Sequence, residues 1–526
     1  MKRHVYTLLI VLGVMHSARA DDHSCTDPIC DTVIECCSCD DHNSHCYTGR
    51  THYAQRPQGA HHSRMIMGNT DIWHHDRDNF FASANCALSY SQSFDDNKIT
   101  TWFLPHGSRV ITFGPDAQPG DTTSADVRAI EFGLSPAFKG SVCLSSTLKH
   151  VIADIDISAR FDDCLCGLWG RLNIPLTYAQ WEVSIDEDIT TVGDTTYPNQ
   201  LVTAQTEPAV PVAFKHIRDA WCGDQGFGDA PALRAGKLCC NRNHAFHAAG
   251  IRADLGYNFI NAKRWFAGAG LTVVAGVGTM PSDKYLFQPV IGAGKSWQVG
   301  GTFSTGCSLT HRKSRAISVT LDATAVHILR STQHRVFGLK NNGVWSQYLL
   351  LKKFKADGTA YDRLERAANI LAFDVAIGAA VMATMALSAH YRNGNGFGIT
   401  VGAEGWVRTR ETMQCICPLT IPDNTYGIKG NTLVAGADAL KTASTSTIKT
   451  AGPADATTVF LTSDDIDVCP ALHPLAVSGK GFLSIEQHWD FIEVQPFVSV
   501  GTEVEFGRGN TAINQWSIVF KGGASY

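Results

Sequence analysis

The most regular feature of this sequence is an alternation of apolar and polar residues with a period of two. Even positions are apolar from residue 80 to 90, and odd positions are apolar from 151 to 161. The alternation returns in 168–178, 249–259, 265–277, 317–325 and 397–407. A period of two indicates strands whose two faces meet different surroundings. Strands of about 9 to 11 residues with an apolar face and terminal aromatics predict an all-β, antiparallel transmembrane β-barrel of roughly 12–16 strands.

The C-terminal strand alternates to the last residue of the chain, through Trp516, Ile518 and Phe520 to Tyr526. It resembles the assembly signal of bacterial outer-membrane barrels, with tyrosine in place of the more usual phenylalanine. Closure into a barrel also removes the free apolar edge that such a strand would otherwise present. We therefore expect the Tyr526 strand to engage the barrel-assembly machinery.

Two internal segments allow other interpretations. The apolar run 370–387 could be a transmembrane helix, but the alternation from Phe373 to Leu387 favours a strand with one apolar face. Residues 358–368, with Thr359 and Asp362 spaced as a capping box, predict a brief helix or a loop.

The N-terminus has the layout of a signal peptide. Lys2 and Arg3 precede an apolar run too short to span a bilayer, and Ala18-Arg19-Ala20 forms a cleavage site. Residues 1–20 are thus predicted to be removed, 21–79 to be a Cys- and His-rich plug or periplasmic segment, and 80–526 to be the barrel. Long polar loops near 186–245 and 418–481 are expected on the extracellular side.

Charge and motifs exclude several classes of function. The formal net charge is -5, without a basic patch for nucleic acid. The sequence contains no Gly-x-Ser-x-Gly elbow, phosphate loop or His-Glu-x-x-His helix, so we expect neither an enzyme nor a cofactor.

Seventeen cysteines in an exported chain favour disulfide bonds, with at least one thiol left free or linked to another chain. The candidates are Cys25, Cys30, Cys36, Cys37, Cys39, Cys46, Cys222, Cys239, Cys240 and Cys469. A metal site is the alternative for the N-terminal cluster, where His42 and His45 accompany the cysteines, but the spacing matches no standard zinc module.

If the apolar faces meet lipid, the charged residues of the opposite faces line the lumen. These channel-lining candidates are Asp154, Asp156, Arg160, Arg171, Arg252, Asp254, Asp322, Asp374, Arg392, Glu404, Arg408, Glu493, Glu503, Glu505 and Lys521. Acidic members outnumber basic ones nine to six, which predicts a weak preference for cations.

The pattern over residues 80–526 resembles the large cysteine-rich outer-membrane porin-like proteins of intracellular, chlamydia-like bacteria. The similarity lies in the alternating strands, the turn at 395–398, the segment 426–430 and the strand 500–506. It implies a bacterial cell outer-membrane location, passive diffusion of small hydrophilic solutes and a structural role in the envelope. Its expected partners are outer-membrane lipid, further copies of the chain and disulfide-linked envelope proteins. The alternatives are a surface adhesin on a closed barrel and a secreted β-sandwich.

Overall fold

A computed structural model describes residues 55–68 and most of 81–525. Its gaps in the second range are 105–107, 116–124, 162–164, 195, 198–209, 240–241, 263, 313–314, 356–360, 417–418, 431–444, 453–457, 469–474, 490, 492–493 and 509–511. The predicted signal peptide, the cysteines from Cys25 to Cys46, and Tyr526 lie outside the described residues.

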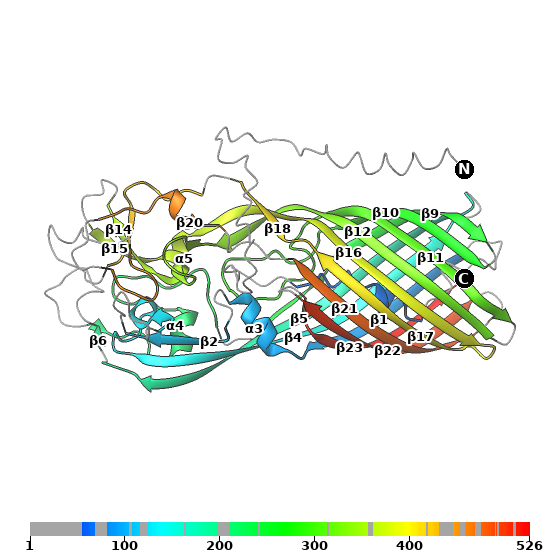
Figure 1. Ribbon diagram of the computed structural model, residues 1–526, viewed down its shortest axis with the longest axis horizontal. Helices are drawn as coiled ribbons and strands as arrows, with labels where there is room; N and C mark the ends of the chain where they lie inside the picture. Colours follow the sequence, from blue (N-terminus) through cyan, green and yellow to red (C-terminus); the bar gives the residue numbers. More distant parts are fainter. Residues whose placement is uncertain are drawn as a thin grey trace.

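Twelve antiparallel strands close into one barrel (Figure 1). They are β1 (Phe81–Ser93), β4 (Lys139–Arg160), β5 (Leu168–Thr191), β9 (Ile251–Ala262), β10 (Trp265–Ala275), β11 (Gln298–Arg312), β12 (Arg315–Val336), β16 (Ala372–Asn393), β17 (Phe397–Arg408), β21 (Ala476–His488), β22 (Gln495–Arg508) and β23 (Gln515–Ser525). The C-terminal strand β23 pairs with both β22 and β1, which closes the barrel and leaves no free edge at the C-terminus. The all-β barrel prediction is confirmed, at the lower end of the predicted strand number.

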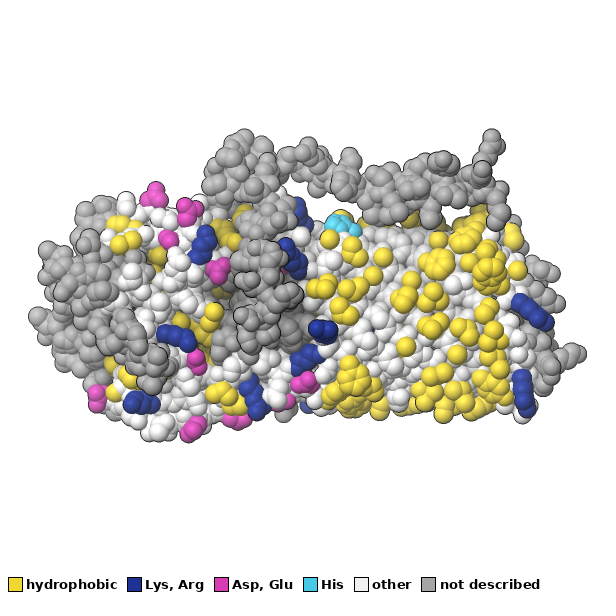
Figure 2. All heavy atoms as spheres, viewed as in Figure 1, with side chains coloured by type: hydrophobic (Ala, Val, Ile, Leu, Met, Phe, Trp, Pro, Cys, Tyr) yellow, Lys and Arg dark blue, Asp and Glu magenta, His cyan; other side chains and the backbone are white. Residues whose placement is uncertain are grey.

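The outer face of the barrel is apolar. Leu88, Leu255 and Phe520 are all at least half exposed, and each belongs to a face that the alternation identified. Figure 2 shows hydrophobic side chains spread over the barrel, whereas acidic side chains gather mainly on the other half of the molecule. In water an apolar surface of this extent would drive aggregation, but lipid covers it without cost. The protein is therefore an outer-membrane β-barrel, and a secreted β-sandwich is excluded.

The two ends of the barrel differ. Five pairs of consecutive strands (β4/β5, β9/β10, β11/β12, β16/β17 and β21/β22) come together at the end where β1 begins and β23 finishes, and at most seven residues join the two strands of each pair. Short turns mark the periplasmic end of such barrels. Among the described residues, no helix is long and apolar enough to cross a membrane.

At the opposite end, long strands and connections build what we call the outer region (Figure 1). Its strands are β2 (Val110–Gly114), β3 (Val127–Arg128), β6 (Thr196–Tyr197), β7 (Val210–Pro211), β8 (Arg242–Ala248), β13 (Gly338–Leu339), β14 (Leu350–Phe354), β15 (Tyr361–Arg366), β18 (Glu411–Cys415), β19 (Tyr426–Ile428) and β20 (Ile466–Asp467). Its helices are α3 (Asp96–Phe103), α4 (Ile217–Cys222) and α5 (Ala367–Ile370), with short 3-10 turns at Ala129–Phe132, Ser346–Tyr348 and Ser463–Asp465. Buried aromatic rings, among them Phe132, Trp221, Trp345 and Tyr348, pack edge-to-face or tilted in its core.

The expected helix or loop over 358–368 is wrong for residues 361–366. Residues 361–366 form β15, which pairs with β14, and only the four residues of α5 are helical. Residues 361–366 form a strand and not a helix because the neighbouring strand β14 offers backbone hydrogen bonds along their whole length.

The apolar face predicted for 373–387 changes sides within β16. Val375, Ile377 and Ala379 are buried, whereas Met385 and Leu387 face lipid. The pairing with β12 has two register shifts, between Val326 and Ser331, and an irregular pairing step reverses which parity points inward. The strand itself is confirmed.

Candidate functional site

The lumen is occupied by residues 55–68, which we call the plug. It contains the short helix α2 (His62–Ile66) and is buried along most of its length. At its start, Gln55 bonds to His150 near the outer end of the lumen, and at its end Gly68 lies against Phe497 and Ser499 near the periplasmic end. A barrel of eight strands is filled by its own side chains, whereas one of 16 to 18 leaves a water channel. Twelve strands leave room for one chain segment.

Arg56 holds the plug to two sides of the wall. Its guanidinium forms an ion pair of 2.8 Å with Glu505 of β22 and another with Glu404 of β17, and it lies 5.5 Å from the centre of the Trp406 ring. All three charged side chains are almost completely buried. Glu404 also accepts a hydrogen bond of 2.7 Å from the backbone N–H of Ser63.

The short helix of the plug has its own contacts with the wall. Arg64 forms an ion pair of 3.1 Å with Asp154 of β4. Lys521 of β23 donates hydrogen bonds of 3.1 and 2.8 Å to the backbone oxygens of Arg64 and Met65. A lysine placed there satisfies carbonyls that a helix C-terminus leaves open. Below it, Ile66 and Met67 pack with apolar side chains of the wall.

Lys480 of β21 is a site residue that the sequence analysis missed. Its ammonium lies 3.1 Å from Glu503 and 3.7 Å from Glu404, and it donates a 2.6 Å hydrogen bond to Nδ1 of His61. It was missed because residues 418–481 were assigned to a loop, although the odd-numbered residues from Val477 to Ile485 continue the lipid-facing alternation.

Twelve of the fifteen predicted lumen residues point inward and are buried or nearly so. They are Asp154, Asp156, Arg160, Arg171, Arg252, Asp254, Asp322, Glu404, Arg408, Glu503, Glu505 and Lys521. The prediction for Asp374 is wrong, because the parity change in β16 places this side chain outside, where it pairs with His334 at 2.6 Å. Arg392 is only half-buried beside the periplasmic turn, and Glu493 lies outside the described residues.

The plug balances the charge of the wall. Among the described residues, the charged side chains that are at least nine-tenths buried on the inward faces of the barrel strands and β18 are nine carboxylates (Asp154, Asp156, Asp254, Asp322, Glu404, Glu411, Glu486, Glu503 and Glu505) and seven cations (Arg160, Arg171, Arg252, Arg335, Arg408, Lys480 and Lys521), and the half-buried Arg392 at the periplasmic end is not counted. The two arginines of the plug match the excess of two carboxylates. The predicted acidic excess thus belongs to the wall alone, and the seated plug removes it.

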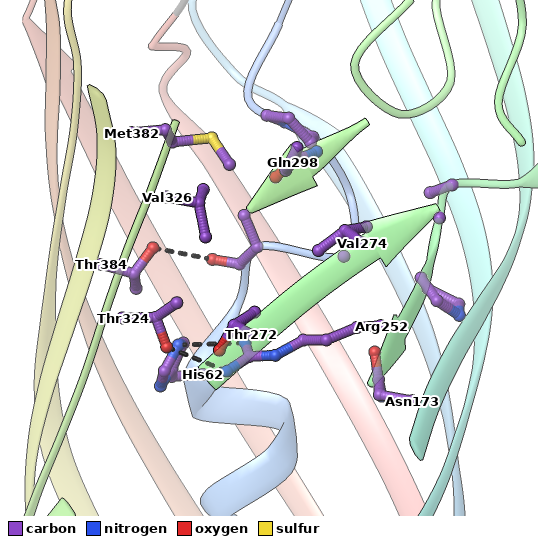
Figure 3. Close-up of a pocket in the computed structure, with 16 residues that line it drawn as sticks. His62, Asn173, Arg252, Thr272, Val274, Gln298, Thr324, Val326, Met382 and Thr384 are labelled. Carbon is purple, nitrogen blue, oxygen red and sulfur yellow. Dashed lines mark hydrogen bonds between the residues drawn. The ribbon is translucent and has the colours of Figure 1, made fainter. Parts of the chain in front are cut away.

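A small cavity lies between the plug and the wall (Figure 3). Pro57, Gly59, Ala60 and His62 of the plug form one side, and β5, β9, β10, β11, β12 and β16 supply the rest together with Ala249 and Gly250. It adjoins Pro175, where β5 changes partner from β9 to β8 because proline has no N–H for the ladder.

The floor and roof of this cavity differ in polarity. Thr324 of β12 and Thr384 of β16 are direct neighbours across the strands, and one step nearer the outer end Val326 and Met382 are neighbours in the same way. On the polar level, Arg252 donates to Thr324 at 2.9 Å and pairs with Asp254 at 2.9 Å. Its guanidinium also lies 3.4 Å from His62 of the plug. Figure 3 shows the two side chains pointing toward each other.

Of the disulfide candidates, Cys222 and Cys239 form a disulfide in the outer region, which confirms both as disulfide cysteines. Cys240, Cys469 and the six N-terminal candidates lie outside the described residues. Cys86, Cys143, Cys166 and Cys307 form no disulfide with another described residue. Within the described part of the chain, no group of three or more His, Cys, Asp or Glu side chains could hold a metal ion.

No family model matches the sequence, and no curated protein matches it. Solved structures do show a similar fold. An outer membrane channel from Pseudomonas putida F1 is 10% identical, with a TM-score of 0.31 and coverage of 84% of this chain and 96% of that one. A FadL homologue from Pseudomonas aeruginosa is 9% identical (TM-score 0.29; 90% and 99% coverage), and the outer membrane protease OmpT from Escherichia coli is 7% identical (0.23; 86% and 97%). At these values the likeness concerns the barrel alone.

Proposed function

We propose that the protein is an outer-membrane channel for small polar solutes, closed by the plug and opened when the plug leaves its seat. The observation that carries this proposal is the set of ion pairs by which Arg56 and Arg64 attach a separate chain segment to the inside of the barrel. If the inside of the barrel served only as a structural core, apolar side chains from the wall would be enough to fill it. Here the wall is polar, and the segment that fills it is attached mainly through charges.

The energetics of these contacts suit a movable segment. Burying an ion pair costs nearly as much as its attraction returns, so such pairs favour a position more than they add stability. When the plug moves out, its arginines and the carboxylates of the wall regain water. The free-energy difference between seated and released states can therefore be small enough for a gate.

Polar solutes are the class that this wall favours. Serine, threonine, histidine and charged side chains face the lumen along the barrel, and a released plug would leave them hydrated. An apolar solute would have to cross this layer without compensating contacts.

The test compares the wild type with a variant in which residues 55–68 are replaced by a Gly/Ser linker of equal length. Both proteins are refolded in detergent, checked for the compact heat-modifiable band of a folded barrel on SDS gels, and inserted into planar bilayers. We expect rare openings for the wild type and steady conductance for the variant, together with faster swelling of liposomes in a small sugar.

A folded variant that carries no current would refute the channel. The remaining function would then be that of a surface protein, the adhesin of the sequence analysis, with its contacts in the outer region.

A further inference from the structure

Gln298 of β11 is the one wall residue of the cavity whose polar side chain has no hydrogen bond to any described residue. The residue is 4% exposed, its carboxamide lines the cavity, and Figure 3 shows it beside Val274 with no bond drawn. The neighbouring polar groups do have partners: Thr384 donates to the backbone oxygen of Ala60, and Asn173 donates to Asp154. Because this amide lines the cavity without a protein partner, an occupant that can form a hydrogen bond is able to pair with it there.

The rest of the roof is apolar. Val274 is paired in register with Gln298 and with Arg252, and Val326 and Met382 complete the apolar side. An occupant that bonds to the amide thus places its remaining atoms against three hydrocarbon side chains.

The cavity carries no net charge for an ionic ligand to meet. The guanidinium of Arg252 is matched by the carboxylate of Asp254, which also accepts a hydrogen bond of 2.7 Å from Thr272. A charged ligand would lose its hydration without gaining a free counter-charge.

We infer that this cavity binds a small neutral molecule with an apolar body and one hydrogen-bonding group, and that the bound molecule holds the channel closed. The second half rests on the proposed channel function. Four residues that line the cavity belong to the plug, so the cavity is complete only while the plug is seated. A ligand that binds one state and not the other shifts the equilibrium towards the state it binds.

Benzyl alcohol is the probe, and toluene and benzoate are its comparisons. Binding to the detergent-refolded protein is measured by saturation-transfer NMR. We expect benzyl alcohol to bind more tightly than either comparison. Gln298→Leu keeps the size of the side chain and removes the amide, so it should weaken the binding of benzyl alcohol about fivefold and leave the binding of toluene unchanged.

Val326→Phe fills the cavity and should abolish specific binding of all three probes. Its matched control is Val299→Phe on β11, which adds the same atoms on the lipid-facing side, where Val299 is 38% exposed. Partition of the probes into micelles is the same for both variants, so the difference between them reports the cavity. Equal binding by the two variants, or no effect of Gln298→Leu, overturns the binding site and leaves a cavity that holds water only.

Closure is read from single-channel records at a benzyl alcohol concentration ten times its dissociation constant. The ratio of open to closed time should fall about tenfold for the wild type and for Val299→Phe, and should not change for Val326→Phe. A rise in open time overturns the inhibitory role. If the probes bind to the wild type and not to Val326→Phe, but neither protein conducts, the binding site is supported and the channel function is refuted.

Discussion

Replacing Arg56 by glutamine should release the plug. Among the described residues of the plug, only Arg56 forms ion pairs with carboxylates on two different strands, Glu404 of β17 and Glu505 of β22. Removing one partner from a buried ion pair costs about 3–5 kcal/mol, because the remaining charge stays buried and uncompensated. That cost applies to the seated state, since in the released state water reaches both carboxylates.

The cost of Arg56→Gln to the seated state should lie at the lower end of this range of about 3–5 kcal/mol. Glu404 keeps the N–H of Ser63 at 2.7 Å and the ammonium of Lys480 at 3.7 Å, and Glu505 keeps hydrogen bonds from Ser478 and Gln515. We therefore expect a loss of about 3 kcal/mol, which raises the ratio of open to closed time roughly a hundredfold in single-channel records.

Arg171→Gln is the matched control. Arg171 forms a 2.7 Å ion pair with Asp156, and both residues belong to the wall. The substitution removes the same charge from the lumen without touching a contact of the plug. It should change ion selectivity as much as Arg56→Gln does, while its open time stays within about twofold of the wild type.

Equal open times for Arg56→Gln and Arg171→Gln would refute the reasoning, because the effect would then come from lumen charge and not from the seat of the plug. If Arg56→Gln does not give a heat-modifiable barrel, Arg64→Gln replaces it. Arg64 has one ion pair with the wall, to Asp154, so the expected rise is smaller but has the same sign.

Three further predictions follow from the same structure. Replacing residues 55–68 by the Gly/Ser linker uncovers an excess of two carboxylates, so the reversal potential in asymmetric KCl should shift towards cations; a shift towards anions contradicts the charge balance. Gly396→Ala should destabilise the barrel by at least about 1–2 kcal/mol in urea titrations in lipid vesicles, because Gly396 has φ 82° and an added Cβ would lie 2.0 Å from the backbone oxygen of His488. Gly405→Ala is the control and should leave the stability unchanged, because an added Cβ there would meet no atom within 4 Å. Leu255→Arg on the lipid face should cost about 2–4 kcal/mol in the same titrations, and a value no larger than that of Leu255→Ala would remove Leu255 from the lipid-facing surface.

The barrel could be predicted because its sequence signal is local. Each strand separates lipid from a polar interior, so side chains two residues apart share one environment, and the pattern is visible without knowledge of the partner strand. The same logic correctly placed Asp154, Glu404 and Glu503 inward. It failed at Asp374, because a pairing irregularity with β12 reverses the parity within one strand, and no residue type announces that reversal.

The site could not be predicted in the same way. Arg56 lies 348 and 449 residues before its two partners, and the plug shows no alternation because it contacts the wall on all sides. Its charges look like those of a solvated segment until the barrel is closed around them. The sequence therefore allowed residues 21–79 to be a plug or a periplasmic segment, and only the fold places 55–68 in the lumen.

The charge balance of the lumen links these observations to the gate. The wall alone carries more carboxylates than cations, which is unfavourable in a narrow barrel with lipid around it. The plug supplies the missing positive charge as part of the same chain, so its local concentration near the wall is always high. Free cations in the medium can supply that charge as well when the plug is out, and they are more abundant at high ionic strength. Salt should therefore shift the plug towards the released state, and the closed time of the wild type should shorten as the KCl concentration rises, whereas Arg56→Gln should show a weaker dependence.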